Sequence, residues 1–287
     1  MSGVRHTVSL AAVLTVCFAA GCSNGVDYLS PVRLDQGLVF CLDGIGGYNI
    51  GPQWVREGLD KGGVASAIHI FEWGHGPAGM FIADLVDETG NRKRAAELAR
   101  MVENYQRFYP GRPVYLIGHS GGAGMVVFAL EQMSTDTQVD AAFLLAPALD
   151  PGRNLAPALR HVRRYCLATS SPADFPLMGT GTSIFGTMDR KHTLSAGLVG
   201  FQVPKDLSPG DRADYRRLRQ AKWDAKLLAT GHLGGHMGWS STAFAREFIA
   251  PVLRGEEPPA IFKPVTGNAE DTPQASGAAL VGKGGEP

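Results

Sequence analysis

The stretch Gly118-His119-Ser120-Gly121-Gly122 surrounds one serine with three glycines and lies between two apolar segments. The segment before it, residues 114–117, is short and follows Pro113, which is typical of a buried strand. The segment after it, residues 123–130, is small and apolar throughout and is typical of a buried helix. Backbone segments approach closely where a strand turns sharply into a helix, so little side-chain bulk fits there. The stretch therefore predicts a tight strand-to-helix bend that holds the Ser120 hydroxyl clear of a sheet.

This bend matches the G-x-S-x-G pattern of a nucleophile elbow. The pattern alone is weak evidence in a chain with 37 glycines, because it arises by chance about 0.2 to 0.3 times in such a chain. The alternative is a glycine-rich turn in which Ser120 only caps the following helix. The flanking strand and helix, together with acid and base candidates later in the chain, favour the elbow.

Strand-like and helix-like segments alternate from residue 37 onward, which indicates a parallel sheet covered by helices on both faces. The sequence thus predicts an α/β domain over residues 37–254 with about six strands. We expect strands over residues 37–42, 66–73, 114–117, 139–145, 165–169 and 225–229, and helices over residues 51–61, 92–109, 123–130, 155–162 and 241–253.

The two ends of the chain have a different composition. An apolar run over residues 8–18 is too short for an ordinary membrane span and is typical of a signal-peptide core. It is followed by Ala19-Ala20-Gly21-Cys22, which resembles the lipobox of bacterial lipoproteins, although Leu is more usual than Ala at position 19. We therefore expect a signal peptide over residues 1–21, a lipid on Cys22 and a tether over residues 22–36. Secretion after cleavage at another small residue is the alternative.

This leader predicts an exported protein, anchored by lipid to a bacterial membrane and facing the periplasm or the cell exterior. At the other end, residues 255–287 contain 6 Gly and 5 Pro with little apolar periodicity. That composition predicts a disordered tail.

Charge and cysteine content exclude further classes of protein. The chain has 27 basic and 27 acidic residues, and it lacks the basic patch expected of a nucleic-acid-binding protein. Cys17 and Cys22 belong to the leader, which leaves Cys41 and Cys166. Both lie in apolar strand-like runs on separate strands, so we expect buried thiols and no disulfide.

From about residue 37 to residue 254 the chain resembles the α/β-hydrolase superfamily. The serine bend and the succession of strands and helices carry this resemblance. The resemblance implies a three-layer fold with Ser120 as the nucleophile. A serine hydroxyl is a poor nucleophile at neutral pH and needs an imidazole base oriented by a carboxylate.

The base is expected after the last strand, where Gly231–Trp239 offers His232 and His236. The resemblance favours His236, which follows paired glycines and precedes a helix, and leaves His232 as the alternative base or a packing residue. A zinc site of the zincin type is excluded, because its two histidines lie on a helix with a Glu between them and here Leu-Gly-Gly intervenes. We therefore expect no bound metal.

The acid is expected at the end of the strand over residues 165–169. Asp174 lies in a turn that begins with Pro172 and is the first choice, since strand ends border the crevice of an α/β sheet. Asp189 and Asp150 are the alternative acids. A carboxylate that is not the acid is interpreted as a turn or capping residue.

Two backbone amides are expected to form an oxyanion hole. The resemblance implies the amide of Gly121 and an amide from the loop after the first strand. The family often has His-Gly in that loop, whereas this chain has Asp43-Gly44, which leaves Ile45 as the donor. The same loop lacks the third glycine of a dinucleotide-binding G-x-G-x-x-G, since Asn49 stands there. We therefore expect no cofactor.

Two further features have open interpretations. The segment between Phe175 and Phe201 mixes glycine with large apolar residues, and is interpreted either as a wall that receives an acyl chain or as a loop packed on the core. His69 and His75 have no evident partners and are expected at surface or packing positions.

Together these features predict a serine hydrolase that cleaves small-molecule or lipid-like carboxylic esters through an acyl-enzyme intermediate, without a cofactor. A peptidase, a thioesterase or an acyltransferase would use the same residues. A non-catalytic binding protein displayed at the cell surface is the alternative from a different class.

Overall fold

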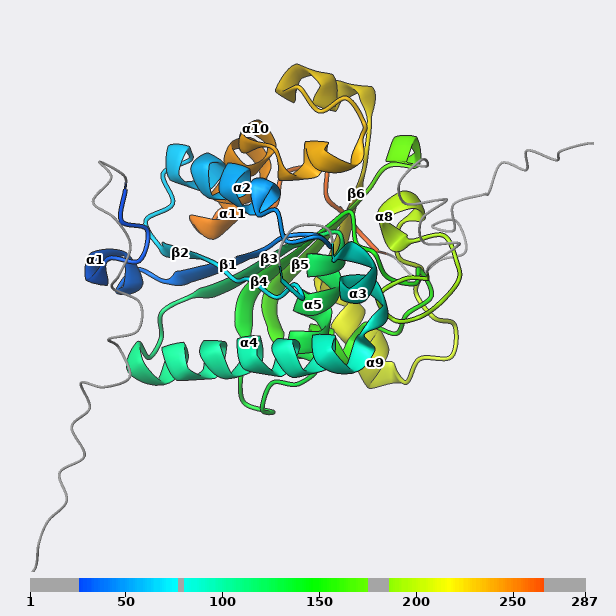
Figure 1. Cartoon of the computed structure of the whole chain (residues 1–287), viewed down its shortest axis with the longest axis horizontal. Helices are drawn as coiled ribbons and strands as arrows, with labels where there is room; N and C mark the ends of the chain where they lie inside the picture. The colour runs from blue at the N-terminus through cyan, green and yellow to red at the C-terminus, as the bar shows by residue number, and fades with distance from the viewer. Residues whose placement is uncertain (1–25, 77–79, 175–185, 266–287) are drawn as a thin grey trace, which may run out of the picture.

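The computed structural model describes residues 26–76, 80–174 and 186–265. Its centre is a seven-stranded sheet in the order β2-β1-β3-β4-β5-β6-β7 (Figure 1). Strands β1 to β6 are parallel to their neighbours, and β7 is antiparallel to β6. The strands are β1 Leu38–Leu42, β2 Ala67–Ile70, β3 Val114–His119, β4 Val139–Leu145, β5 Val162–Ser170, β6 Leu218–Lys222 and β7 Lys263–Pro264.

Helices cover both faces of this sheet, with α2, α10 and α11 on one side and α4 and α5 on the other (Figure 1). The helices are α1 Pro31–Leu34, α2 Ile50–Lys61, α3 Phe81–Val86, α4 Glu88–Phe108, α5 Gly121–Leu130, α6 Ala156–Leu159, α8 Ala196–Val199, α9 Pro209–Asp214, α10 Thr242–Phe244 and α11 Ala250–Leu253. A π-helical segment, Ala245–Ile249, joins α10 to α11. This is the three-layer α/β-hydrolase arrangement, so the predicted fold class is confirmed.

The two cores follow directly from strand geometry. Successive side chains of a strand point to opposite faces, so a central strand with helices on both sides must be apolar at every position. In β1, Leu38 and Phe40 lie in the core beneath α4 and α5, whereas Val39 and Cys41 lie in the core beneath α2. The central strands β1, β3 and β4 are buried at every position.

One predicted strand is wrong. Residues 225–229 belong to a 3₁₀ helix, Ala225–Thr230, and the sixth parallel strand is β6, Leu218–Lys222. Strand β6 pairs with the short β7 on its outer side; Arg219 and Gln220 are partly buried and Lys222 is exposed. A strand near the sheet edge needs no continuous apolar run, and this explains why hydrophobicity alone did not detect it.

Both predicted domain boundaries need correction as well. The expected disordered tail begins too early, because residues 255–265 are part of the fold: β7 extends the sheet and Phe262 is buried. The expected tether also ends too late, because α1 packs on the domain. The Tyr105 hydroxyl donates a hydrogen bond to Leu34 O at 2.6 Å, and Arg33 forms an ion pair with Asp60. The predicted signal peptide and Cys22 lie outside the described residues.

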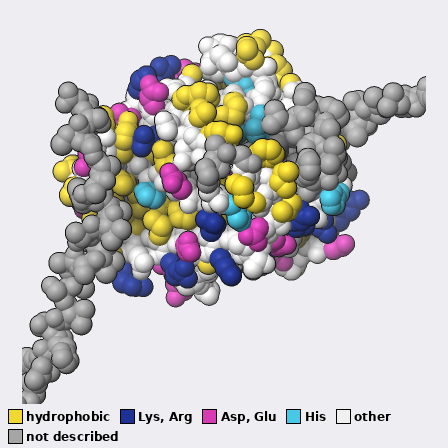
Figure 2. Space-filling model, viewed as in Figure 1, with side chains coloured by type: hydrophobic (Ala, Val, Ile, Leu, Met, Phe, Trp, Pro, Cys, Tyr) yellow, Lys and Arg dark blue, Asp and Glu magenta, His cyan; other side chains and the backbone are white. Residues whose placement is uncertain are grey.

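The prediction for the two cysteines outside the leader agrees with the structure. Cys41 and Cys166 are free and buried, as predicted, and burial raises the pKa of each thiol to about 12. On the face seen in Figure 2, basic and acidic side chains are interspersed. Among the described residues, every helix is too short or too polar to cross a bilayer.

Candidate active site

The bend at Ser120 joins β3 directly to α5. Ser120 has φ 55° and ψ −118°, a conformation that costs energy for a residue with a side chain, and its amide donates a hydrogen bond to Leu145 O at 2.8 Å. A Cβ atom on Gly122 would lie 2.3 Å from Asp43 O. A Cβ atom on Gly118 would lie 2.3 Å from Gly122 O. Glycine is therefore required at both positions, and the predicted bend is present.

A histidine and a carboxylate meet beside this bend. Asp174 ends the 3₁₀ helix Pro172–Asp174 that follows β5, and His236 begins the 3₁₀ helix His236–Ser240. His236 Nδ1 lies 2.5 Å from Asp174 Oδ2, and both side chains are buried. The two loops are joined by the Ser171 hydroxyl, which donates to Gly234 O at 2.5 Å. Asp174 is thus close enough to hold one tautomer of His236.

His119 connects the histidine to the bend. Its Nε2–H donates to His236 O at 3.1 Å, and the two ring centroids are 4.5 Å apart. Burial, together with the neighbouring His236, lowers the pKa of His119 from 6.5 to about 3, so this ring is neutral. His236 therefore packs against the residue that immediately precedes Ser120.

No hydrogen bond joins Ser120 to His236 in this structure. Among the described residues, neither Ser120 Oγ nor His236 Nε2 has a hydrogen-bond partner. Ligand-free enzymes often have long contacts between nucleophile and base that shorten when substrate binds. His236 therefore remains the candidate base.

The loop after β1 lies against the bend. A Cβ atom on Gly121 would lie 2.9 Å from Ile45 Cγ2, and one on Gly44 would lie 3.2 Å from Ser120 Cβ. Neither the Ile45 amide nor the Gly121 amide donates to an acceptor in the described part of the chain. Trp73 Nε1–H supports the loop by donating to Asp43 O at 2.9 Å. Two unused amides, at Ile45 and Gly121, therefore border the serine.

The Asp43 carboxylate bonds to the backbone of its own loop. It is buried and accepts a hydrogen bond from the Gly44 amide at 2.9 Å. Burial raises its pKa, while the hydrogen bonds from the amides of Gly44 and Asn49 oppose that change. Asp43 thereby shapes the loop at the position where the family often has histidine.

His232 is a packing residue. It is fully buried, its Nδ1 accepts from the Gly234 amide at 3.1 Å, and its ring meets Trp239 edge-on at 4.3 Å. Burial lowers its pKa from 6.5 to about 4. It has no described contact with Ser120 or Asp174.

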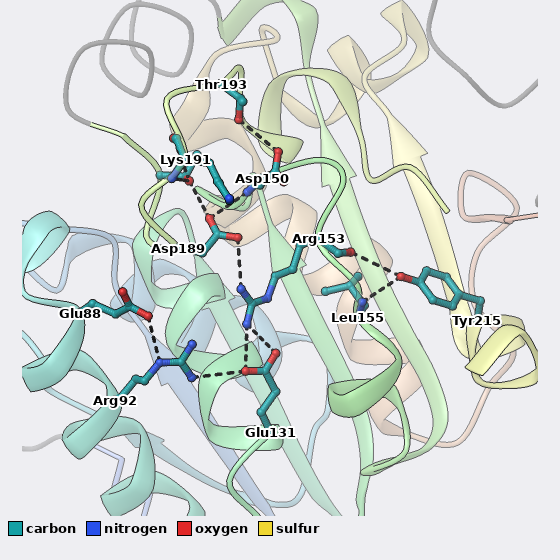
Figure 3. Close-up of polar contacts among 11 residues, drawn as sticks. Glu88, Arg92, Glu131, Asp150, Arg153, Leu155, Asp189, Lys191, Thr193 and Tyr215 are labelled. Carbon is teal, nitrogen blue, oxygen red and sulfur yellow. Dashed lines mark hydrogen bonds and ion pairs between the residues drawn. The ribbon is translucent and has the colours of Figure 1, made fainter. Parts of the chain in front are cut away.

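The alternative acids lie in a separate polar network (Figure 3). Asp189 accepts a hydrogen bond from the Thr187 hydroxyl at 2.6 Å and forms an ion pair with Arg153 at 3.2 Å. Asp150 accepts from the Thr193 hydroxyl at 3.2 Å. Arg153 continues the network to Glu131 at 2.6 Å. Within the described part of the chain, no hydrogen bond or ion pair joins either alternative carboxylate to a histidine.

Only part of the segment that was interpreted as an acyl-chain wall is described by the structure. Residues 175–185 lie outside the described residues. Met188 and Leu198, which follow, are buried in the core that includes α5, so at these positions the segment packs on the core. His69 is also a packing residue, because its ring meets Phe40 edge-on and burial lowers its pKa.

The sequence patterns predicted no role for His119 and placed His75 at a surface or packing position. The position of His119 next to Ser120 could have predicted that it lies at the site. No such local signal marks His75: its ring nitrogens contact Asp84 and Asp87, which lie nine and twelve residues further along the chain. Among the described residues, no group of three or more His, Cys, Asp and Glu side chains is arranged to hold a metal ion.

Part of the chain is similar in sequence to a known protein family. Residues 59–158, which include the bend, match a family model described as an alpha/beta hydrolase of unknown function. No curated protein matches the chain significantly in sequence. The family match supports a hydrolase, and its reaction must be inferred from the site.

Solved structures similar to the chain include three proteins with low sequence identity. A predicted CIB-like hydrolase from Thermoplasma acidophilum is 15% identical over 77% of this chain and 87% of its own, with a TM-score of 0.40. An acetylxylan esterase is 15% identical over 76% and 98%, with a TM-score of 0.44. Lipase B from Aspergillus fumigatus is 10% identical over 82% and 56%, with a TM-score of 0.48.

Proposed function

We propose that this protein is a serine hydrolase that cleaves carboxylic esters through an acyl-enzyme intermediate. The observation that carries the proposal is the strained Ser120 bend beside a buried His236–Asp174 pair whose Nδ1 to Oδ2 distance is 2.5 Å. A strained serine, a paired histidine and two unused amides are the groups that acyl transfer needs.

The first half of the reaction forms the acyl-enzyme. His236 Nε2 accepts the proton of the Ser120 hydroxyl while Oγ attacks the ester carbonyl. The resulting imidazolium is stabilised at Nδ1 by Asp174, and the oxyanion accepts hydrogen bonds from the amides of Ile45 and Gly121. His236 then protonates the leaving alcohol as the C–O bond breaks.

The second half reverses the roles. His236 takes a proton from water, the hydroxide attacks the acyl-enzyme carbonyl, and the same amides hold the second oxyanion. Proton return to Ser120 Oγ releases the carboxylic acid. No step requires a redox change.

A fluorophosphonate probe tests this proposal, because it reacts with an activated serine irrespective of substrate preference. Labelling of the wild type, lost in Ser120→Ala and His236→Ala, is the expected result. Ser134→Ala is the matched serine control, since Ser134 is exposed and its hydroxyl bonds Thr137 Oγ1 at 2.7 Å. His161→Gln is the histidine control, since its ring bonds Thr137 O at 2.8 Å. Folded wild type that is never labelled would favour the non-catalytic binding protein.

The cellular location is proposed from the sequence alone. The segment Ala19-Ala20-Gly21-Cys22 supports a lipid on Cys22, which would hold the enzyme at a membrane outside the cytoplasm. Cys22→Ser should move the protein from the membrane fraction to the soluble fraction. Continued membrane association of that variant would contradict lipidation at this residue.

A further inference from the structure

A buried carboxylate holds the loop that carries the Ile45 amide. Asp84, in α3, is 1% exposed, and its Oδ2 accepts a hydrogen bond from the Gly46 amide at 2.7 Å. Gly46 has φ 96°, a conformation that favours glycine. The carboxylate thus fixes the peptide that directly follows Ile45.

His75 completes this attachment from the other side. Its backbone amide donates to Asp84 Oδ1 at 2.7 Å, and its Nδ1 lies 2.9 Å from the same oxygen. Its Nε2 lies 2.7 Å from Asp87 Oδ2. We call these three side chains the Asp84–His75–Asp87 bridge. Both ring nitrogens face carboxylate oxygens, and only the imidazolium can donate from both.

The bridge is anchored to a long helix. Asp87 is the N-cap of α4 and accepts from the Gly90 amide at 2.9 Å. The buried Asn91 of α4 donates from Nδ2 to Asp84 O at 2.6 Å. The loop after β1 is therefore tied to α4 through Asp84 and His75.

The charged groups that surround His75 favour its protonated form. The hydrogen bond with Asp87 is the largest cause that raises its pKa, and Asp84 acts in the same direction. Burial and the nearby Arg94 of α4 act against them. The bridge is complete at pH values below the ordinary pKa of histidine. As the pH rises through the raised pKa, one of the two donated hydrogen bonds is lost.

We propose that the Asp84–His75–Asp87 bridge positions the Ile45 amide for the oxyanion, so that ester turnover falls when His75 loses its proton. The inference rests on the proposed function. His75 and Asp84 are positioning residues, because they act through the loop and do not touch the substrate. Turnover should therefore fall as the pH rises and the bridge loses its proton.

The test is the pH profile of kcat on a chromogenic ester, measured from about pH 5 to about pH 9. His75→Gln should remove the alkaline fall, because an amide does not titrate, and should lower kcat at mildly acidic pH by about tenfold with KM nearly unchanged. His161→Gln should retain the wild-type profile, because His161 precedes the N-terminal end of β5, whereas Ser120 follows the C-terminal end of β3, and both strands run parallel to β4.

Asp87→Asn is the second variant, and it is expected to fold because Asp87 is 43% exposed in its side chain and Asn is an equally good N-cap. It removes the largest cause of the raised pKa, so the alkaline fall should move to lower pH. An unchanged fall in His75→Gln, or an unmoved fall in Asp87→Asn, would overturn the inference while Ser120 labelling remained. Wild type that neither cleaves esters nor reacts with the fluorophosphonate would overturn both proposals.

Discussion

Replacing Asp174 with Asn is the most specific test of the proposed site. The substitution preserves the shape of the side chain and removes its negative charge. Asp174 is 2% exposed, and its Oδ2 lies 2.5 Å from His236 Nδ1, so little solvent is present to replace the lost charge. The amide cannot stabilise the imidazolium, and if its NH₂ group faces Nδ1 it selects the wrong tautomer for accepting the Ser120 proton.

The expected loss follows from that geometry. A buried carboxylate that orients a catalytic histidine contributes about 10³- to 10⁴-fold to kcat, or about 4 to 5.5 kcal/mol at 1.36 kcal/mol per factor of ten. KM should change little, because Asp174 is separated from the substrate by His236. Unfolding in urea should show that the variant remains folded.

Steady-state hydrolysis of a chromogenic ester measures this loss. Asp189→Asn and Asp150→Asn are matched controls with the same chemical change at carboxylates that accept hydrogen bonds from threonine hydroxyls. Both should retain a kcat close to that of the wild type. If Asp174→Asn kept near wild-type turnover while Asp189→Asn lost it by orders of magnitude, the assignment of the acid would be wrong.

Three further predictions concern stability. Gly122→Ala places a Cβ atom 2.3 Å from Asp43 O. The free energy of unfolding in urea should therefore fall by about 3 kcal/mol. A stable, fully active variant would refute the close approach of residue 122 to the loop of Asp43. Glu131→Gln weakens the part-buried ion pair with Arg153. It should lower the free energy of unfolding by about 2 kcal/mol without altering kcat. An unchanged free energy of unfolding would show that the ion pair does not stabilise the fold. Burial lowers the pKa of His232 from 6.5 to about 4, so this side chain binds a proton more readily in the unfolded chain. The contribution of neutral His232 to the free energy of unfolding is therefore complete above about pH 6.5 and is lost toward pH 4. His232→Gln should therefore show a weaker pH dependence of unfolding over that range, and an equal dependence would contradict this cause.

The local part of the site could be predicted because it depends on neighbouring residues. The bend needs glycine where its backbone segments approach one another, and the sequence has glycine at positions 118, 121 and 122. The buried strands β1, β3 and β4 were predicted for a similar reason, since strands covered on both faces are apolar throughout. Strand β6 was missed because it lies near the sheet edge, where its faces are only partly covered and its sequence is not continuously apolar.

The choice among carboxylates required distances between distant segments. Asp174, Asp189 and Asp150 all follow predicted strands, and the sequence pattern ranked them without excluding any. The hydroxyl of Ser171 joins the turn of Asp174 to the loop of His236, 62 residues further along the chain from Asp174. The ion pair of Asp189 with Arg153 commits that carboxylate to another network.

By itself the sequence determined the layered α/β fold, the position of the strained serine and the histidine-bearing loop, because each is a pattern within a few consecutive residues. Only the tertiary structure decided which carboxylate meets His236, that residues 255–265 complete the sheet, and that Asp84 and His75 hold the loop after β1. Those contacts join segments far apart in the chain. Their geometry is set by how the helices pack on the sheet, which no local pattern of residue types encodes.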